Sequence, residues 1–172
     1  MASDRYAEFL PAISKWIQET LDAHAGKAKP VASFQFPRLP RYFSEQLLTT
    51  TSVVITDHLP RPPLSALGLS AFSSFEKQAM RAITYLDTYF LEPGAATDES
   101  MHFHELVHVV QWQVLGPKNF LLLYADGLTK RGYLECPLEA IAYGHQRKFD
   151  VHWPSYLVEG EVRKQTLELL NN

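Results

Sequence analysis

One stretch, residues 98–117, constrains the fold of this chain most, because it carries both ends of a helix and a chemical motif. Asp98 provides a side chain of the N-cap type, while Gly116 and Pro117 provide a left-handed stop followed by a helix breaker. Between these ends the chain reads His104-Glu105-Leu106-Val107-His108, a match to the pattern H-E-x-x-H. The sequence therefore predicts that this motif lies on a helix.

The spacing of the two histidines brings their side chains to one face of that helix. At about 100° per residue, His104 and His108 point within roughly 40° of each other, so both imidazoles can reach one metal ion. Gln111 falls on the same stripe, and Glu105 lies where it can polarise a metal-bound water without being a ligand. Five apolar side chains on the other side are expected to pack into a core: Phe103, Leu106, Val107, Val110 and Val114.

A plainer explanation of the two histidines is that core hydrogen bonds satisfy both rings, or that the rings lie at the surface. We favour a metal site, because two histidines and a glutamate would otherwise be costly to bury on a helix this apolar. Two histidines alone make a poor zinc site, since catalytic zinc usually takes three protein ligands and keeps one position for water. A third donor is therefore expected downstream.

The best candidate for the third ligand lies on a second predicted helix that begins at Pro137. Glu139, Tyr143 and Gln146 share one stripe of this helix, whereas apolar residues share another. We choose Glu139 as the ligand, with Glu135 as its rival, because Glu135 precedes the helix and is less constrained in position. Tyr143 is a candidate catalytic residue that donates its hydroxyl to a developing oxyanion, and a simply packed tyrosine is the alternative.

Three more residues of ligand type carry separate expectations. His145 falls on the apolar stripe of its helix and is expected to be a satisfied core histidine. His102 points about 160° away from His104, so we expect it at the surface or beside the ligands. Cys136, the single cysteine, is expected to be a small buried side chain, and its isolation suits a reducing compartment.

The motif at 104–108, followed by Glu139 on a later helix, resembles the zincin metallopeptidases. Among these it is most similar to the gluzincin branch, whose third ligand is a glutamate on a separate helix, and the likeness covers roughly residues 82–150. The stretch is also similar to small bacterial zincin-like proteins of unestablished function. The resemblance implies that His104, His108 and Glu139 bind Zn²⁺ and that Glu105 is the general base. It also implies a small sheet beside the motif helix.

The remaining segments predict more helices than strands. Helices are expected over residues 3–24, as a turn at 44–48, over 119–125 with an end at Asp126-Gly127, and from Pro154 onward; strands are expected over 31–36, 52–56 and 82–91. Pro11 either kinks the first helix or starts its main part, and residues 59–64 form an extended connection. We therefore expect a single α+β domain over residues 1–172, zincin-like and helix-rich, with a small sheet beside the central helix.

Charge and hydropathy limit the expected partners. The formal net charge is -3 and no basic run is longer than a couple of residues, so we expect no nucleic-acid partner. No apolar run approaches membrane-spanning length, and the N-terminus lacks the basic and apolar regions of an export signal. We expect a cytoplasmic protein without a membrane partner.

These features together predict a zinc-dependent metallopeptidase that acts on a peptide or protein substrate. The metal would activate a water, and Glu105 would take its proton and hand it to the leaving amine. A strand over 82–91 would pair with the peptide by its free edge, and a plain sheet strand is the alternative. Two other functions stay open, namely a catalytically inactive zincin-like binding or regulatory domain and a zinc hydrolase of non-peptide substrates. Whether residues 1–40 cover the cleft is open too, as is the oligomeric state.

Overall fold

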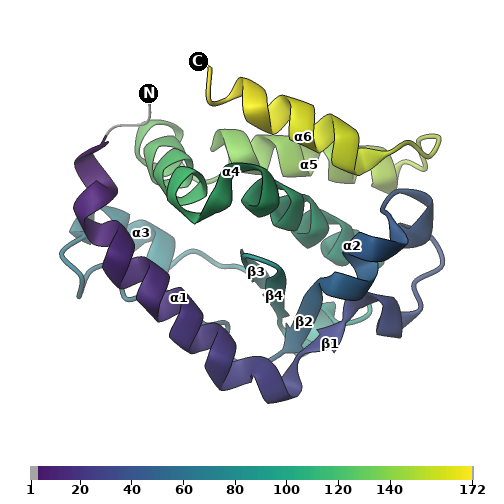
Figure 1. The fold of residues 1–172 in the computed structure, drawn as a ribbon, viewed down its shortest axis with the longest axis horizontal. Helices are drawn as coiled ribbons and strands as arrows, with labels where there is room; N and C mark the ends of the chain where they lie inside the picture. The colour runs from purple at the N-terminus through teal and green to yellow at the C-terminus, as the bar shows by residue number, and fades with distance from the viewer. Residues whose placement is uncertain (1–3, 172) are drawn as a thin grey trace.

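The long helix α4, Glu99–Arg131, runs through the middle of the fold, and the other elements pack around it (Figure 1). Residues 4–171 are described in this computed structural model. Helices α5, Pro137–Asp150, and α6, Val158–Glu168, cover one side of α4. A small sheet lies on the other side, flanked by α1, Leu10–His24. The structure therefore confirms the predicted α+β class, with many helices and a small sheet beside the helix that carries the motif.

The sheet is mixed and has four short strands. These are β1, Lys29–Pro30, β2, Ser52–Ile55, β3, Ala82–Tyr85, and β4, Thr88–Leu91. Their order is β1-β2-β4-β3, with β2 and β4 parallel and the other two neighbours antiparallel. Strand β3 therefore forms one edge of the sheet, and the strand contacts α4.

Two strand predictions need correction. The segment 82–91 is a hairpin and not one strand, because the chain reverses at Leu86, which adopts a left-handed backbone with φ 57°. The segment 31–36 is not a strand either, since Val31–Phe34 forms a 3-10 turn that ends at Gln35 with φ 55°. Only the two residues before this turn pair with β2. The prediction of a strand over 52–56 is confirmed by β2.

The helices at the two ends of the chain begin later than predicted. A 3-10 turn over Asp4–Phe9 precedes α1, and Pro11 lies in the first turn of α1, so this proline starts the helix without kinking it. The predicted start at residue 3 lies outside the described residues. The final helix, α6, begins at Val158 and not at Pro154. Helix α2, Glu45–Thr50, confirms the predicted turn, and Ser44 caps it by accepting a hydrogen bond from Leu47 N.

Helix α4 consists of two helical halves joined at a kink. Gly116 adopts φ 68° and ψ 167°, so its φ is positive but its ψ is extended and not that of a left-handed helical stop. The helix resumes at Pro117 and continues to Arg131. Gly127 therefore does not end a helix. It is buried where α5 begins, and a Cβ added to it would lie 2.7 Å from Cys136 Sγ and 2.9 Å from Pro137 Cδ. Glycine at this position lets the start of α5 approach α4 closely.

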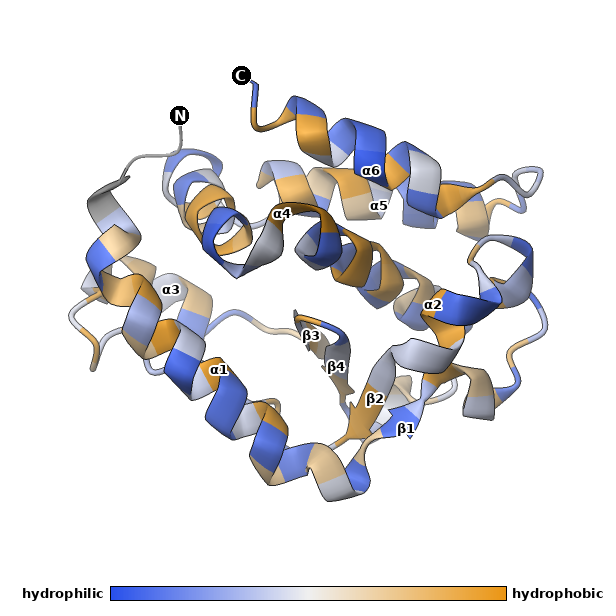
Figure 2. Ribbon diagram, in the orientation of Figure 1, coloured by the Kyte–Doolittle hydropathy of each residue, from blue (hydrophilic) through white to orange (hydrophobic). Residues whose placement is uncertain are grey.

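Helix α4 contacts α5, α6 and β3, and its ribbon carries both hydrophobic and hydrophilic residues (Figure 2). Every residue from 102 to 112 is buried, so the polar stripe of this helix does not face solvent as an amphipathic helix would require. The five apolar side chains expected in the core pack there, with Val114 only partly buried. Within residues 4–171, no helix combines the length and the apolar character needed to cross a lipid bilayer.

Candidate metal centre

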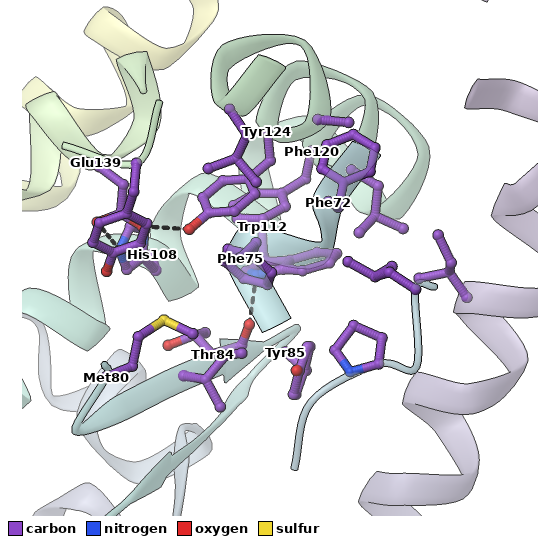
Figure 3. Close-up of a pocket in the computed structure, with 18 of the residues that line it drawn as sticks. Phe72, Phe75, Met80, Thr84, Tyr85, His108, Trp112, Phe120, Tyr124 and Glu139 are labelled. Atoms are coloured by element: carbon purple, nitrogen blue, oxygen red, sulfur yellow. Dashed lines mark hydrogen bonds and ion pairs between the residues drawn. The ribbon is translucent and has the colours of Figure 1, made fainter. Parts of the chain in front are cut away.

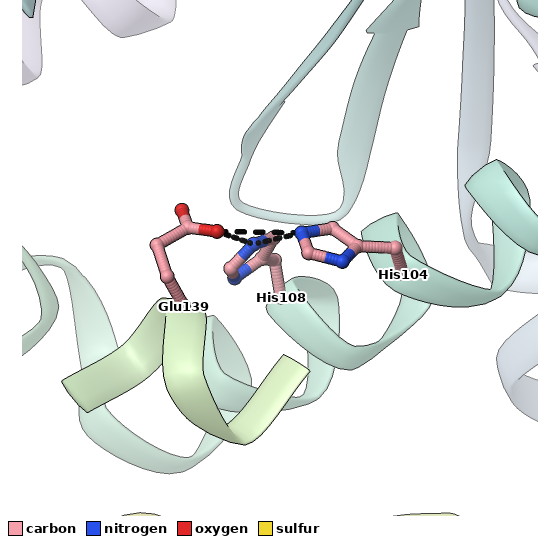
Figure 4. Close-up of side chains that lie close together, drawn as sticks. All are labelled: His104, His108 and Glu139. Atoms are coloured by element: carbon pink, nitrogen blue, oxygen red, sulfur yellow. Dashed lines mark hydrogen bonds and ion pairs between the residues drawn. The ribbon is translucent and has the colours of Figure 1, made fainter. Parts of the chain in front are cut away.

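Three buried side chains converge where α5 crosses the first half of α4 (Figure 4). The Nε2 atoms of His104 and His108 lie 3.0 Å apart, and each lies 3.4 Å from Oε2 of Glu139. The three residues are 4%, 6% and 2% exposed, respectively. Within the described part of the chain, they are the one group of three or more His, Cys, Asp or Glu residues whose ligand atoms lie this close together.

Two glutamines hold the outer nitrogens of the histidine rings. His104 Nδ1 lies 2.9 Å from Gln146 Oε1, and His108 Nδ1 lies 2.8 Å from Gln111 Oε1. The amide nitrogens of these glutamines donate elsewhere, Gln146 to Ser100 Oγ at 2.9 Å and Gln111 to the carbonyl of Leu138 at 2.9 Å. Each glutamine therefore presents its oxygen to a histidine, so each Nδ1 must carry the proton.

This arrangement directs the Nε2 atoms of both rings toward each other and toward a carboxylate. Oε2 of Glu139 is buried and makes no hydrogen bond of acceptable geometry within the described residues. Three electron-rich atoms in one buried site repel each other unless a proton or a cation lies between them. Their separations of 3.0 to 3.4 Å match the spacing of about 3.3 Å between ligands of a tetrahedral zinc ion with bonds of about 2.0 to 2.1 Å.

The charges of these groups reflect their proximity. Burial alone would lower the pKa of His108, but the charge of Glu139 and the polar contact with it raise this pKa to about 9. Burial likewise opposes ionisation of Glu139, yet the charge of His108 and the contacts with both rings hold the pKa of this carboxyl well below its usual range. The metal-free site therefore holds a proton on His108 opposite an ionised Glu139, and a divalent cation would displace that proton.

Tyr124 orients the carboxylate of Glu139. Its hydroxyl donates to Glu139 Oε1 at 2.7 Å, which leaves Oε2 directed at the two histidines. Tyr124 lies in the second half of α4, beyond the kink at Gly116. We had no expectation for this tyrosine from the sequence, where it reads as one apolar residue of a helix. Its contact depends on how the two halves of α4 and the start of α5 pack, and no local pattern signals that.

Glu105 lies beside the same site and is held by the edge strand of the sheet. Its Oε2 accepts a hydrogen bond of 2.6 Å from Thr84 Oγ1, and Trp112 Nε1 donates to the carbonyl of Thr84 at 3.2 Å. Glu105 lines one cavity together with His108 and Glu139. The carboxylate is thus buried and oriented, and it faces the space next to the three converging atoms.

Tyr143 is close to the site but does not line the cavity. Its ring packs against His104, with the ring centroids 4.6 Å apart. Tyr133 lies near Tyr143 and lines the cavity with Glu105 and Glu139. Burial, the charge of Glu139 and the neighbouring Tyr143 raise the pKa of Tyr133, so its hydroxyl remains protonated. Tyr143 thus packs on a histidine ring, while Tyr133 is among the tyrosines that line the cavity.

Other candidate residues lie away from the converging atoms. Glu135 is exposed and is not part of the group formed by His104, His108 and Glu139. His145 lies between Tyr156 and Gln165, with hydrogen bonds of 2.6 and 2.9 Å, and Cys136 is buried, as predicted. The surface position expected for His102 is wrong.

His102 is fully buried and bonds both the Tyr89 hydroxyl at 2.6 Å and the Ala96 carbonyl at 3.0 Å. Burial lowers its pKa, which keeps the ring neutral in this position. The direction of this side chain on the helix was anticipated, but a helix covered on every side has no face that reaches solvent.

The N-terminal part of the chain forms one wall of the cavity beside the site. Tyr6, Leu10 and Ile13 line it. Residues 6–13 therefore belong to the wall of the site, although they lie about a hundred residues before the motif in the sequence.

Comparison with known proteins finds no relative of this chain: no family model matches it, and neither a curated protein nor a solved structure shows significant similarity. The geometry of the site is therefore the evidence on which a function has to be argued.

Proposed function

We propose that this protein is a zinc-dependent hydrolase of the zincin type that cleaves peptide bonds. One observation carries the proposal, namely that the Nε2 atoms of two buried histidines, whose Nδ1 atoms face glutamine oxygens, and a carboxylate oxygen of Glu139 converge at ligand spacing. His104, His108 and Glu139 would hold the ion. The glutamines that fix the ring tautomers support this assignment, because metal-binding histidines usually donate their other N–H to an oxygen.

The chain supplies a base at the position where hydrolysis needs one. A bound zinc ion would act as a Lewis acid and make water a better nucleophile at neutral pH. Glu105 is oriented by Thr84 and faces the cavity, so it can accept a proton from water and deliver it to the leaving amine. The Tyr133 hydroxyl lines the same space and can donate to a carbonyl oxygen that gains negative charge.

The edge of β3 supports a peptide as the substrate. In the β3–β4 pair, Glu92 N donates to the Arg81 carbonyl, whereas the Leu91 carbonyl accepts from Thr56 N on the β2 side. Hydrogen-bonded residues alternate along an antiparallel strand, so the backbone groups of Ala82 and Thr84 point away from β4. Trp112 already uses the Thr84 carbonyl. The N–H and C=O of Ala82 and the N–H of Thr84 then face the side on which an extended chain could pair.

The first test is zinc content together with a conservative change at Glu105. The purified protein should bind about one zinc per chain, measured by mass spectrometry of the metal. Glu105→Gln should keep the zinc and lower the rate of hydrolysis of a peptide library by at least about 100-fold, because proton transfer by a positioned base contributes about that much or more. The matched control is Glu135→Gln, an exposed glutamate that should change neither property.

The outcomes separate the proposal from its alternatives. A folded protein that binds no zinc would contradict it. Bound zinc with no hydrolysis of any peptide or amide in the wild-type protein would instead favour a zincin-like binding or regulatory domain.

A further inference from the structure

A cavity of about 110 Å³ extends from the candidate metal centre into the apolar interior (Figure 3). His108 and Glu139 lie at one end of it, and Glu105 is among the residues that line it. The other end lies among aromatic and aliphatic side chains from α1, from residues 62–80 and from the second half of α4. Trp112 and Phe120 stack there with their ring centroids 3.8 Å apart.

The far end of this cavity offers no charge and little free hydrogen-bonding capacity. Among the residues that line it, the acidic and histidine side chains are the three at the metal end, and no lysine or arginine is present. The Tyr85 hydroxyl donates to the Pro60 carbonyl at 2.8 Å, and the Tyr124 hydroxyl donates to Glu139. A charged or strongly polar group placed there would lose its hydration without gaining partners.

The volume of the cavity limits the size of the group that fits. An engineered apolar cavity of about 150 Å³ in another protein binds benzene. The cavity in this chain is somewhat smaller, and its outer end is open to the metal centre. It therefore accommodates one side chain of roughly the size of a phenyl or leucyl group, and not an extended acyl chain.

The geometry points to a substrate that places one uncharged apolar side chain, about the size of one aromatic ring, in this cavity beside its scissile carbonyl. The inference rests on the proposed hydrolase function and defines its substrate class. The walls come from segments far apart in the sequence, including Leu10 on α1 and Ala125 on α4. The preference for an apolar side chain is thus a property of the tertiary structure and not of the metal-binding motif.

Hydroxamates that differ in one substituent test this directly, because each binds zinc through the same group. The zinc-loaded protein should bind 3-phenylpropanohydroxamic acid at least about 20-fold more tightly than acetohydroxamic acid, since the phenyl ring removes apolar surface from water. Succinic monohydroxamic acid, which carries a carboxylate, should show no such gain. Equal affinities for the phenyl and methyl compounds on zinc-loaded protein would overturn the inference while leaving the hydrolase proposal intact.

Two substitutions and a metal-free measurement complete the test. Ala125→Phe fills the cavity and should abolish the phenyl preference without changing zinc content, whereas Ala23→Phe on the exposed face of α1 should leave it intact. Leu10→Trp blocks the cavity from the opposite wall if Ala125→Phe fails to fold. Binding of 3-phenylpropanamide to metal-free protein, weakened by the filling variant and not by Ala23→Phe, would support the cavity even if zinc did not bind. No binding of this amide to folded metal-free protein would count against the cavity.

Discussion

Gln111 and Gln146 fix the orientation of the His108 and His104 rings. Each amide oxygen accepts from an Nδ1–H, so each ring directs its Nε2 atom at Glu139. Tyr143, four residues after Glu139, packs on the ring of His104. The two glutamines are neutral amides, so they orient the rings without adding negative charge to the site.

Loss of one glutamine should therefore weaken metal binding without removing a ligand. Gln146→Leu leaves His104 free to rotate and to change tautomer, and we expect zinc affinity to fall by about 10 to 100-fold. Gln113→Leu, on the exposed side of the same helix, should leave the affinity unchanged. Competition with a chromophoric chelator measures both variants. An equal loss of zinc affinity in both variants would show that general destabilisation of the fold, and not the orientation of the His104 ring, is responsible.

Helix α4 positions the site through two glycines with opposite roles. Gly116 has φ 68° and forms the kink that separates the ligand-bearing half from the half that contains Tyr124. Gly127 lies in the second half and contacts the start of α5. These two positions bring Tyr124 and Glu139 together from separate helices, 15 residues apart in the sequence.

Substitution of Gly127 should lower the free energy of unfolding, whereas substitution of another helical glycine should not. Gly127→Ala places a methyl group 2.7 Å from Cys136 Sγ, and we expect the free energy of unfolding to fall by about 1 to 3 kcal/mol. Gly144→Ala, on α5 with open space around it, should raise it by about 0.5 to 1 kcal/mol through helix propensity. Urea denaturation of both variants measures the difference. A stabilising effect of Gly127→Ala would show that α5 does not pack this closely.

Side chains from the strands and from α4 pack into two separate apolar clusters. Alternate residues of the sheet point into different clusters, Val53 and Tyr89 into one and Val54 and Phe90 into the other. Helix α5 does the same, with Leu138 in one cluster and Ala142 in the other. Glu139 lies between these two residues on α5, so an ion at this site would tie α5 to α4 where both clusters meet.

The free energy of unfolding of the metal-free protein should therefore fall as pH rises, whereas the stabilisation added by zinc should grow. In metal-free protein, the pKa of His108 is raised from 6.5 to about 9, so its stabilising contribution is complete below pH 6.5 and is lost as pH rises through about 9. This loss should reach at most about 3 kcal/mol. Zinc needs the same nitrogen unprotonated, so stabilisation by zinc should grow over that range.

Thermal and urea unfolding with zinc or with a chelator, at pH 6.5 and pH 9, distinguish these effects. A thousandfold excess of zinc over its dissociation constant should add about 4 kcal/mol to the free energy of unfolding. Metal-free stability that does not change between these pH values would contradict the assigned proton on His108.

Several local features were predictable because neighbouring residues alone determine them. Asp98 accepts from Met101 N and begins α4, Ser44 caps α2, and Pro137 occupies the first turn of α5. The one-turn spacing of His104 and His108 likewise brings both rings to one point on any α-helix. These inferences need only backbone geometry and side-chain chemistry within a few residues.

The stripe of α5 that carries Glu139 follows from local helix geometry, but its distance from the histidines required the packing of α5 on α4. The hairpin turn at Leu86 was missed, since β-propensity does not indicate where a strand reverses. The contacts of Tyr124, the burial of His102 and the cavity wall at Leu10 depend on segments far apart in the chain. Hydrophobic pattern and caps specify elements one at a time, whereas burial, pKa shifts and cavities arise only when separate elements exclude water from a shared space.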